Sequence, residues 1–437
     1  MTSYSTIVKE RLLSIIQEMS QTRSLYVVNP KKDFTRKRKL SFEDMMQIII
    51  AMGGDNIYKE LLKATDYQPG TPTTSAFIQQ RAKILPEAFE FLLREFNKTH
   101  ETTNTFHGYD LYAVDGSDVL VPTNPKDADT FFKTSPGGTG FNMIHLNALY
   151  DLCNNLYVDA FVVPQRECGE REALINFLTR SPYKDKIILV ADRGYEGYNC
   201  FAHIERKGWN YVVRVKDIHS QGILAGLDLP QDGEFDTRVD LILTKKQTKE
   251  VTDNPQIYKV LSGNKTFDFL DLHDNKFYPM SFRVIRFKLP DDSYTAVITN
   301  LFHFSTQQII DIYKMRWGIE TSFRKLKYTV GLVNFHAKTR EFIIQEIFAK
   351  IIMYNFTEMI TSHVVISKPN AKYCYKVNFS VAVLVCKQLL LLNNKPPPDV
   401  EALIQKNTVP IDKVRSKTAT RRCSRSKSAV SFFYRVA

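Results

Sequence analysis

Residues 187–191 read IILVA, an apolar run with no polar interruption that stops at Asp192. A run of this length and composition is typical of a strand buried on both faces, as in the sheet of an α/β protein. Arg193 and Gly194 come next and predict a turn directly after the strand. This feature therefore predicts an α/β fold with a carboxylate at the carboxyl end of a buried strand.

The segment before this run predicts more strands of the same sheet. Residues 111–117, LYAVDGS, predict a short strand that ends at Asp115, and residues 143–163 predict two strands joined by a turn around Asn154. Residues 170–180 predict a helix. The order strand, strand, strand, helix, strand predicts the opening of a ribonuclease-H-like α/β core.

The regions on either side have different patterns. Residues 1–105 show helical spacing of apolar residues, and Ser41 is placed to cap the helix that FEDMMQIIIAM predicts. Between about 215 and 300, short apolar or alternating segments separated by polar turns predict a β-rich insertion. Helices are predicted again up to about residue 394.

The composition of the 437 residues excludes several classes of protein. Hydrophobic residues make up 43% and charged residues 24%, which fits a soluble globular chain. Charged residues interrupt the longest apolar stretches, 343–356 and 377–392, which therefore predict buried helices and no membrane span. Six cysteines without a CxxC pair or zinc-binding spacing predict a cytoplasmic protein with reduced thiols.

The net charge of +12 favours a polyanionic partner. Residues 31–39, KKDFTRKRK, hold six basic residues and one Asp, and the sequence leaves a solvated loop and a phosphate-binding arm as equal alternatives. Residues 413–437 hold eight basic residues and no acid, which predicts a tail that contacts nucleic acid.

Residues 311–332, DIYKMRWGIETSFRKLKYTVGL, predict one amphipathic helix. At about 100° per residue, an arc of about 60° at the edge of its apolar face holds Tyr313, Arg316, Glu320 and Lys327. The apolar face itself consists of Ile312, Met315, Ile319, Phe323, Leu326 and Val330. A solvated face with a Glu–Arg ion pair would show the same pattern, so the arc alone does not establish a site.

Three carboxylates are the candidate chemical groups: Asp115 and Asp192 at predicted strand ends, and Glu320 beside basic groups. Strand ends are where α/β sheets bind ligands, although an Asp after a strand more often caps a turn. Hard oxygen ligands from separate elements suit Mg²⁺ or Mn²⁺, and two such ions can activate a water or a 3′-hydroxyl for phosphoryl transfer. Asp118 and Glu196 are the nearest alternative carboxylates.

These motifs resemble those of a known family. DGS at 115–117, DRG at 192–194 and Tyr313-x2-Arg316-x3-Glu320-x6-Lys327 are similar to motifs of the DDE transposases of bacterial insertion sequences. The resemblance is to the insertion-sequence-four group, whose last acid lies in a Tyr–Arg–Glu–Lys signature. The spacing of the signature is specific, whereas DGS and DRG alone are not. In general layout the resemblance covers residues from about 40 to 360.

The resemblance implies an order of domains and a set of roles. The expected domains are a helical DNA-binding domain (1–105), a ribonuclease-H-like core (106–214 and 301–365), a β-rich insertion (215–300) and a helical C-terminal region with a basic tail (366–437). It implies that Mg²⁺ or Mn²⁺, as two ions, is bound by the catalytic residues Asp115, Asp192 and Glu320. Contacts to DNA phosphates are expected from Tyr313, Arg316, Lys327 and Arg193.

A protein of this group would bind the terminal inverted repeats of its element, cut the ends and join them to target DNA. The expected partners are double-stranded DNA, at transposon ends and target, and a second copy in a homodimer on paired ends. No membrane partner is expected, and the expected location is the bacterial cytoplasm, associated with the nucleoid. The sequence leaves two alternatives: a metal-dependent nuclease of the same fold without strand transfer, and a DNA-binding derivative without catalysis.

The tryptophans depart from what part of the group shows. Some members release DNA through a hairpin and stack a flipped base on a Trp of the insertion. This chain has only Trp209 and Trp317, neither of them in the predicted insertion, so the stacking residue would have to be Tyr258, Tyr278, Phe282 or Tyr294. Trp317 is expected to pack in the core, and His145 to be structural.

Overall fold

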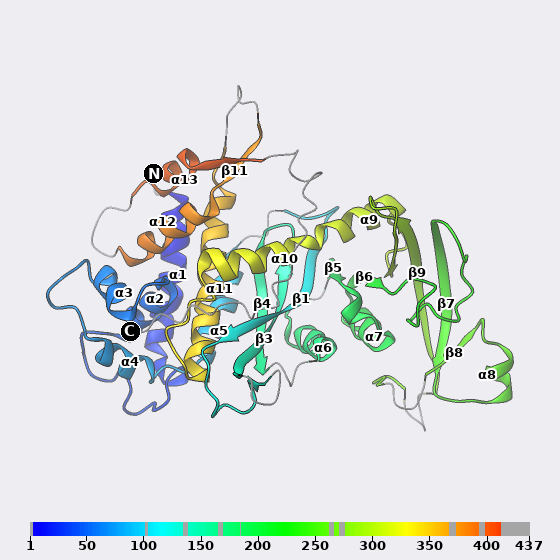
Figure 1. Cartoon of the computed structure of the whole chain (residues 1–437), viewed down its shortest axis with the longest axis horizontal. Coiled ribbons are helices and arrows are strands. Elements are labelled where there is room, and N and C mark those ends of the chain that lie inside the picture. The colour runs from blue at the N-terminus through cyan, green and yellow to red at the C-terminus, as the bar shows by residue number, and fades with distance from the viewer. Residues whose placement is uncertain are drawn as a thin grey trace.

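The computed structural model describes most of the chain: residues 3–100, 104–133, 139–164, 169–183, 185–261, 266–270, 276–366, 373–392 and 398–411. Three parts follow one another along the longest axis: a helical end, a central sheet with helices, and a strand-rich end (Figure 1). The predicted basic tail, 413–437, lies outside the described residues. Among the described helices, none combines the length and the apolar composition that a membrane crossing needs.

The N-terminal part is helical, as predicted. Its elements are α1 (Tyr4–Gln21), η1 (Arg23–Leu25), α2 (Phe42–Ala51), α3 (Ile57–Ala64), α4 (Thr74–Arg81) and α5 (Glu87–Lys98). Ser41 caps α2, which confirms the prediction: its hydroxyl accepts the Asp44 N–H, and the Asp44 carboxylate accepts the Ser41 N–H. Such a reciprocal cap satisfies two backbone donors that the first turn leaves without partners.

The long helix α11 (Arg340–Ser362) joins this helical part to the rest of the molecule. Its middle is buried on all sides, which confirms the buried helix predicted at 343–356. The charges that interrupt its apolar sequence have partners from the N-terminal part: Glu346 pairs with Arg81 at 2.7 Å, and the Lys350 Nζ donates to the carbonyl of Met52. Helices α12 (Phe379–Leu391) and α13 (Val400–Lys406) pack beside it.

The central sheet has the strand order β4-β3-β1-β5-β6. Its strands are β1 (Asp110–Val121), β3 (Phe141–Asp151), β4 (Leu156–Pro164), β5 (Ile187–Ala191) and β6 (Asn210–Val215), with the two-residue β2 (Phe131–Phe132) beside β3. The pairs β1–β3 and β3–β4 are antiparallel, and the pairs β1–β5 and β5–β6 are parallel. The predicted order of three strands, a helix and a strand is therefore present, apart from the short β2.

The sheet is buried on both faces, as the apolar run of β5 predicts. Ile188 and Val190 pack into one core with α10 (Trp317–Arg324) and α11, and the other three residues of β5 pack into a second core with α6 (Glu170–Arg180) and α7 (Tyr198–Arg206). Alternate residues of β1 divide in the same way: Ala113 belongs to the first core and Val114 to the second. Each residue of these strands can therefore be assigned to one face.

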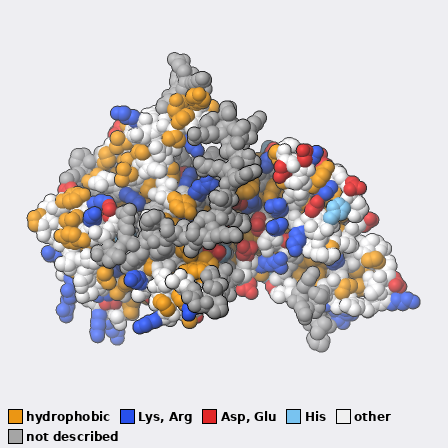
Figure 2. All heavy atoms as spheres, in the orientation of Figure 1, with side chains coloured by type: hydrophobic (Ala, Val, Ile, Leu, Met, Phe, Trp, Pro, Cys, Tyr) orange, Lys and Arg blue, Asp and Glu red, His pale blue; other side chains and the backbone are white. Residues whose placement is uncertain are grey.

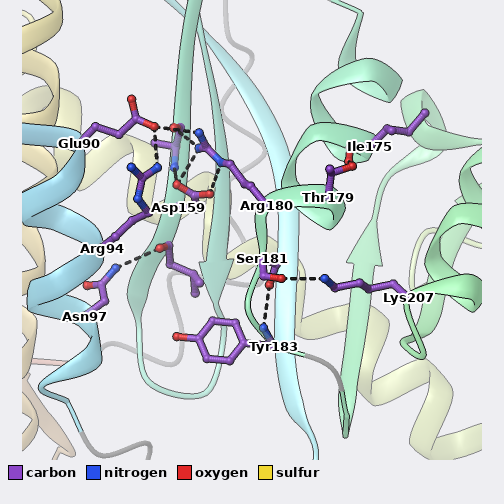
Figure 3. Close-up of polar contacts among 12 residues, drawn as sticks. Glu90, Arg94, Asn97, Asp159, Ile175, Thr179, Arg180, Ser181, Tyr183 and Lys207 are labelled. Carbon is purple, nitrogen blue, oxygen red and sulfur yellow. Dashed lines mark hydrogen bonds and ion pairs between the residues drawn. The ribbon is translucent and has the colours of Figure 1, made fainter. Parts of the chain in front are cut away.

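The helical end is attached to the sheet by a polar cluster around Arg180, the last residue of α6 (Figure 3). The guanidinium binds Asp159 of β4 through Nε at 2.5 Å and Glu90 of α5 through Nη1 at 2.8 Å. It also lies 3.4 Å from the ring centroid of Phe161. One side chain thus connects three elements that are distant in sequence.

The strand-rich part, predicted at 215–300, continues the central sheet. Its elements are β7 (Phe235–Thr244), α8 (Lys249–Asp253), β8 (Tyr258–Val260), β9 (Tyr278–Lys288) and β10 (Tyr294–Thr299). Strand β10 pairs antiparallel with β6, so the order runs on as β6-β10-β9-β7-β8. One of the short apolar segments that predicted this β-rich part, residues 267–272 (FDFLDL), forms no strand in its described part: residues 268 and 269 make a turn, and residues 271 and 272 lie outside the described residues.

The predicted helix 311–332 is divided into three elements: α9 (Thr306–Met315), α10 (Trp317–Arg324) and the π-helix η4 (Lys325–Val330). It starts earlier than predicted because Ser305 and Gln308 form a reciprocal cap. It ends at Gly331, whose φ of 99° favours glycine. The apolar face is confirmed, because five of its six residues are buried and Met315 is half-buried. The remaining elements are the short strands β11 (Tyr375–Val377) and β12 (Thr408–Pro410).

Candidate active site

Asp115 and Asp192 are neighbours on adjacent strands. The parallel pairing of β1 and β5 ends with Val114 opposite Ala191, so the next residue on each strand is an aspartate. Each carboxylate accepts a backbone N–H, from Gly116 at 2.9 Å and from Gly194 at 2.7 Å. These bonds fix the orientation of both side chains at the same edge of the parallel sheet.

The prediction that the first strand ends at Asp115 is wrong. Strand β1 continues to Val121, and Asp115 lies in its middle. The strand continues because β3 pairs with it antiparallel from Asp151 to Asn142, including Ala148 opposite Asp115. Only the parallel pairing stops there, so Asp115 still borders the carboxyl end of β5.

Glu320 is held on the same face of the sheet. Helix α10 packs on β1, and a Cβ atom on Gly318 would lie 2.9 Å from Leu152 Cδ2, so glycine permits this close approach. Arg316 Nη2 binds Glu320 Oε1 at 2.8 Å, which confirms the Glu–Arg pair that the sequence allows. The pair is not an ordinary solvated one, because the Arg316 side chain is 5% exposed and the Glu320 side chain 39% exposed.

Electrostatics link these groups into one site. Burial raises the pKa of Asp115 to about 6; the amide of Gly116 lowers it, while the charges of Asp192 and Glu320 raise it and that of Arg316 lowers it. Asp192, Glu320 and Arg316 therefore all act on Asp115, which is mostly buried. Like charges around a mostly buried acid favour its protonation or the binding of a cation.

The other three residues predicted to contact phosphates, Lys327, Tyr313 and Arg193, differ in their surroundings. Lys327 lies near the site, and its Nζ donates to the carbonyl of Asp118 at 2.7 Å. Tyr313 is buried, 6% exposed, with its ring 6.2 Å from that of Phe287, so it belongs to the core and not to the edge of a cleft. Arg193 is exposed in η3 (Arg193–Tyr195), directly after Asp192.

Three further groups border the site from the opposite face of β1. His145 Nδ1 and Asp118 Oδ1 are 2.7 Å apart, and the buried His145 Nε2 has no hydrogen-bond partner within the described residues. Glu170, the first residue of α6, reaches over Gly194, where an added Cβ would lie 2.1 Å from its Oε2. Burial, and then Asp192, raises the pKa of Glu170. The sequence analysis did not identify Glu170. The signal that could have identified it is its position as an acid in the first turn of the predicted helix 170–180.

The other candidates from the sequence have different surroundings. Glu196 is buried and accepts the N–H groups of Lys216 and Ile223, at 2.9 and 2.5 Å, so it holds a loop. Trp317 is 59% exposed with the Arg316 guanidinium 5.0 Å from its ring, so the expectation that it packs in the core is wrong. Phe282 is fully buried and cannot stack on a base as it stands.

The donor set has the chemistry that a hard divalent cation requires, since Asp115, Asp192 and Glu320 all offer carboxylate oxygens. The burial of Asp115 among like charges supports a cation there. Within the described residues, however, no three Asp, Glu, His or Cys side chains lie close enough together to hold one ion. The three side chains are therefore of the chemical type that binds such a cation. In this structure the Glu320 carboxylate forms an ion pair with Arg316.

Comparison with known proteins gives three findings. The profile of the family described as transposase DDE domain matches residues 106–356. A probable transposase for insertion sequence element IS5377 from Geobacillus stearothermophilus is 33% identical over 72 residues, which are 16% of this chain and 19% of that protein. A structure of piggyBac transposase in a synaptic complex with hairpin DNA aligns with 96% of this chain and 83% of its own, at 10% identity and a TM-score of 0.40.

Proposed function

The chain belongs to the transposase DDE domain family, and on that premise we propose that it cuts the ends of a DNA element and joins them to target DNA. The observation that carries this proposal is the position of Asp115 and Asp192 side by side at the ends of paired strands, with the charge of Glu320 from α10 acting on Asp115. Each acid lies beside a basic group or a backbone N–H, which suits chemistry on a phosphate.

The topology supports a ribonuclease-H-like core for this reaction. The strand order β4-β3-β1-β5-β6, with β3 antiparallel to β1 and with β5 and β6 parallel to it, is the arrangement that such a core requires. Residues 106–214 and 301–365 would form this core, with 215–300 inserted in it. The spacing of Tyr313, Arg316, Glu320 and Lys327 supports membership of the insertion-sequence-four group.

Asp115, Asp192 and Glu320 would hold Mg²⁺ or Mn²⁺, as two ions. The metal would supply an activated water or 3′-hydroxyl and stabilise the leaving oxygen. The protein's own contribution is to hold two aspartates in fixed orientation and to hold Glu320 through Arg316. Because Glu320 is 39% exposed, its carboxylate can change partner without unfolding the helix.

Two cations of the same helix would position the phosphate. Arg316 is buried, and its Nε has no hydrogen-bond partner within the described residues, so this N–H can donate to a phosphate oxygen. Lys327 has three donors, of which one is directed to Asp118. Burial, opposed by Asp118, lowers the pKa of Lys327. Arg193 would contact the phosphates from the other side of Asp192.

The substrate would be double-stranded DNA carrying terminal inverted repeats, and two copies of the chain would pair the two ends. The cytoplasm of a bacterium is the location in which such a reaction takes place. The net charge of +12 supports a polyanionic partner. A nuclease without strand transfer remains the alternative activity, and a derivative without catalysis the alternative from another class.

The test combines three variants with two reactions. Asp115→Asn, Asp192→Asn and Glu320→Gln should each abolish both cleavage of transposon ends and joining of pre-cut ends, and should weaken Mn²⁺ binding measured by calorimetry. Asp110→Asn is the matched control, because Asp110 opens the same strand away from the site. Cleavage without joining by the natural chain would establish the nuclease, and near-normal cleavage by any acid variant would remove that acid from the site.

A further inference from the structure

His145 lies behind the strand that carries Asp115. It stands opposite Asp118 in the antiparallel pairing of β3 with β1. Side chains alternate between the two faces of a strand, and Ala113 of β1 packs into the core that contains α10, whereas Val114 packs into the core that contains α6. Asp115 therefore points to the α10 face, while Asp118 and His145 point to the α6 face. His145 is thus placed to act on the strand from behind, and not on a group that Asp115 binds.

The imidazole ring of His145 lies directly over Gly116. A Cβ atom at residue 116 would be 2.2 Å from Nε2 and 2.8 Å from Cε1 of the ring, so only glycine fits beneath it. The Nε2 atom is buried there and has no hydrogen-bond partner within the described residues. Gly116 is also the residue whose N–H donates to the Asp115 carboxylate at 2.9 Å. The ring therefore packs against the residue that orients Asp115.

A hydrogen bond connects His145 to a second residue of β1. Nδ1 of His145 and Oδ1 of Asp118 are 2.7 Å apart, and because a carboxylate accepts hydrogen bonds, the Nδ1–H is the donor. The backbone carbonyl of the same Asp118 accepts a hydrogen bond from Lys327 Nζ at 2.7 Å. His145 and Lys327 thus hold one residue of β1, the first by its side chain and the second by its carbonyl.

We propose that His145 is a positioning residue for the active site, which holds β1 from behind. By packing on Gly116 it fixes the residue that orients the Asp115 carboxylate, and by binding Asp118 it fixes the carbonyl that holds Lys327. It does not touch the substrate itself, because Gly116 covers Nε2 and Asp118 occupies Nδ1. The proposal rests on the proposed function, in which Asp115 and Lys327 act on DNA. Supporting residues of this kind typically change metal affinity or rate about 10- to 100-fold.

The first test exchanges space between residues 116 and 145. Gly116→Ala places a methyl group where the ring lies, and should weaken Mn²⁺ binding to the full chain about 10- to 100-fold, measured by calorimetry. Gly116→Ala combined with His145→Ala removes the clash and should bind Mn²⁺ more tightly than Gly116→Ala alone. A double variant that folds where the single variant does not is the same recovery. Equal affinities and equal melting temperatures in the two would overturn the contact between the ring and residue 116, and with it the proposal.

The second test removes the ring and leaves Gly116 in place. His145→Ala should lower the single-turnover rate of end cleavage about 10- to 100-fold. Its affinity for DNA should be unchanged, because that affinity depends on exposed cations, such as the Lys and Arg side chains that gather over the N-terminal helices at the lower left of Figure 2. His145→Asn keeps an N–H donor for Asp118 and should recover part of the rate. Cleavage by His145→Ala at the natural rate would overturn the proposal.

His203 provides the matched control. Its Nε2 lies 2.7 Å from Asp268 Oδ2, and the two side chains are 22% and 44% exposed, close to the 14% and 49% of His145 and Asp118. His203 belongs to α7, and its partner lies in the strand-rich part of the chain. His203→Ala should therefore cut DNA at the natural rate. A loss equal to that of His145→Ala would show that the loss of any such pair slows the protein, and would overturn the proposal.

A double-variant cycle tests the path through Asp118. If His145 helps to place Lys327, His145→Ala should slow cleavage less in the Lys327→Ala background than in the natural chain, because the group that it positions is already gone. A purely structural role for His145 predicts that the two losses multiply. Fully multiplicative losses would therefore overturn the link between His145 and Lys327.

Failure of the proposed function would give a different result. If the natural chain binds Mn²⁺ but does not cut DNA, the proposed function fails, and the comparison of Gly116→Ala with the double variant still tests what His145 does to Asp115. If the natural chain cuts DNA and His145→Ala cuts it equally fast, only the proposal for His145 fails.

Discussion

Within the described residues, two buried arginines, Arg81 and Arg316, each bind a glutamate, and their surroundings differ. Between the N-terminal helices and α11, Arg81 donates through Nη1 to Glu346, through Nε to Gln345 and through Nη2 to the carbonyl of Phe342. Both partners of that ion pair have side chains that are 2% exposed. In the candidate active site, Arg316 binds Glu320 through Nη2, while its Nε has no partner within the described residues.

The difference shows that the same kind of ion pair, arginine with glutamate, can have two different roles. A buried pair whose donors are all satisfied fixes a packing arrangement, and losing one partner leaves an uncompensated charge. In the other pair, one arginine N–H has no acceptor and the carboxylate is partly exposed to solvent. Such a pair can therefore bind a further group, such as a ligand. The first pair should matter for stability and the second for reaction rate.

The largest effect is expected from breaking the first pair. Arg81→Met should lower the free energy of unfolding by about 3–5 kcal/mol, because Glu346 is left buried and charged. Urea unfolding followed by circular dichroism measures this. The control replaces both partners: Arg81→Met with Glu346→Met should recover most of the loss. Equal losses in the single and the double variant would mean that packing, and not charge, holds α11 to the N-terminal helices.

The same pair should give the protein a sensitivity to acid. Burial opposes the charge of Glu346, but Arg81 and His336 outweigh it and lower its pKa from 4.5 to about 2. A lowered pKa of an acid stabilises the folded state above the unfolded pKa, and the contribution is lost as pH falls from about 4.5 towards 2. The loss should be on the order of 3 kcal/mol. Unfolding free energies of the natural chain and of Glu346→Gln at pH 6 and pH 2.5 measure it, and a parallel decline in both would contradict this assignment.

The second pair should respond in rate and not in stability. Arg316→Ala and Lys327→Ala should each lower the single-turnover rate of end cleavage about 100-fold, because a positioned cation near the phosphate is lost. The free energy of unfolding should fall less in Arg316→Ala than in Arg81→Met, since Glu320 is left partly solvated, whereas Glu346 is left buried. Mn²⁺ affinity should persist in both. Near-normal cleavage in both variants would reduce Arg316–Glu320 to an ordinary ion pair.

The smallest effect on stability is expected at Trp317, which lies beside the Arg316–Glu320 pair. Trp317 is 59% exposed beside Arg316, whereas Trp209 is buried with its Nε1 donating to the carbonyl of Tyr183. Trp317→Phe should change the free energy of unfolding by less than about 0.5 kcal/mol. It should also remove most of the acrylamide quenching of tryptophan fluorescence. Strong quenching in Trp317→Phe would show that Trp209 is the accessible ring.

Sequence patterns predicted the features that depend on neighbours along the chain. The strand Ile187–Ala191, the cap at Ser41 and the apolar face of 312–330 are each encoded by local spacing, and each is confirmed. The approach of Asp115 to Asp192 could also be predicted, because ligand-binding side chains of an α/β sheet gather at the carboxyl ends of neighbouring parallel strands.

The features that were missed depend on distant residues. The continuation of β1 past Asp115 is decided by β3, and LYAVDGS alone looks like a strand that ends in a turn. The burial of Tyr313 is decided by Phe287 on β9, so a helical arc could not reveal it. The partner of Glu346 lies 265 positions away in Arg81, and no spacing rule connects them.

The π-helix η4 has a consequence for how this chain is compared with others. A turn closed by an i→i+5 bond holds one residue more than an α-helical turn, so η4 is equivalent to a single extra residue absorbed without a loop. Helix α10 leads directly into η4, and the chain turns at Gly331 after it. A motif search that permits no gap between 325 and 330 would overlook relatives whose helix lacks that residue. Deletions within η4 are thus the natural place to look for length variation downstream of Glu320.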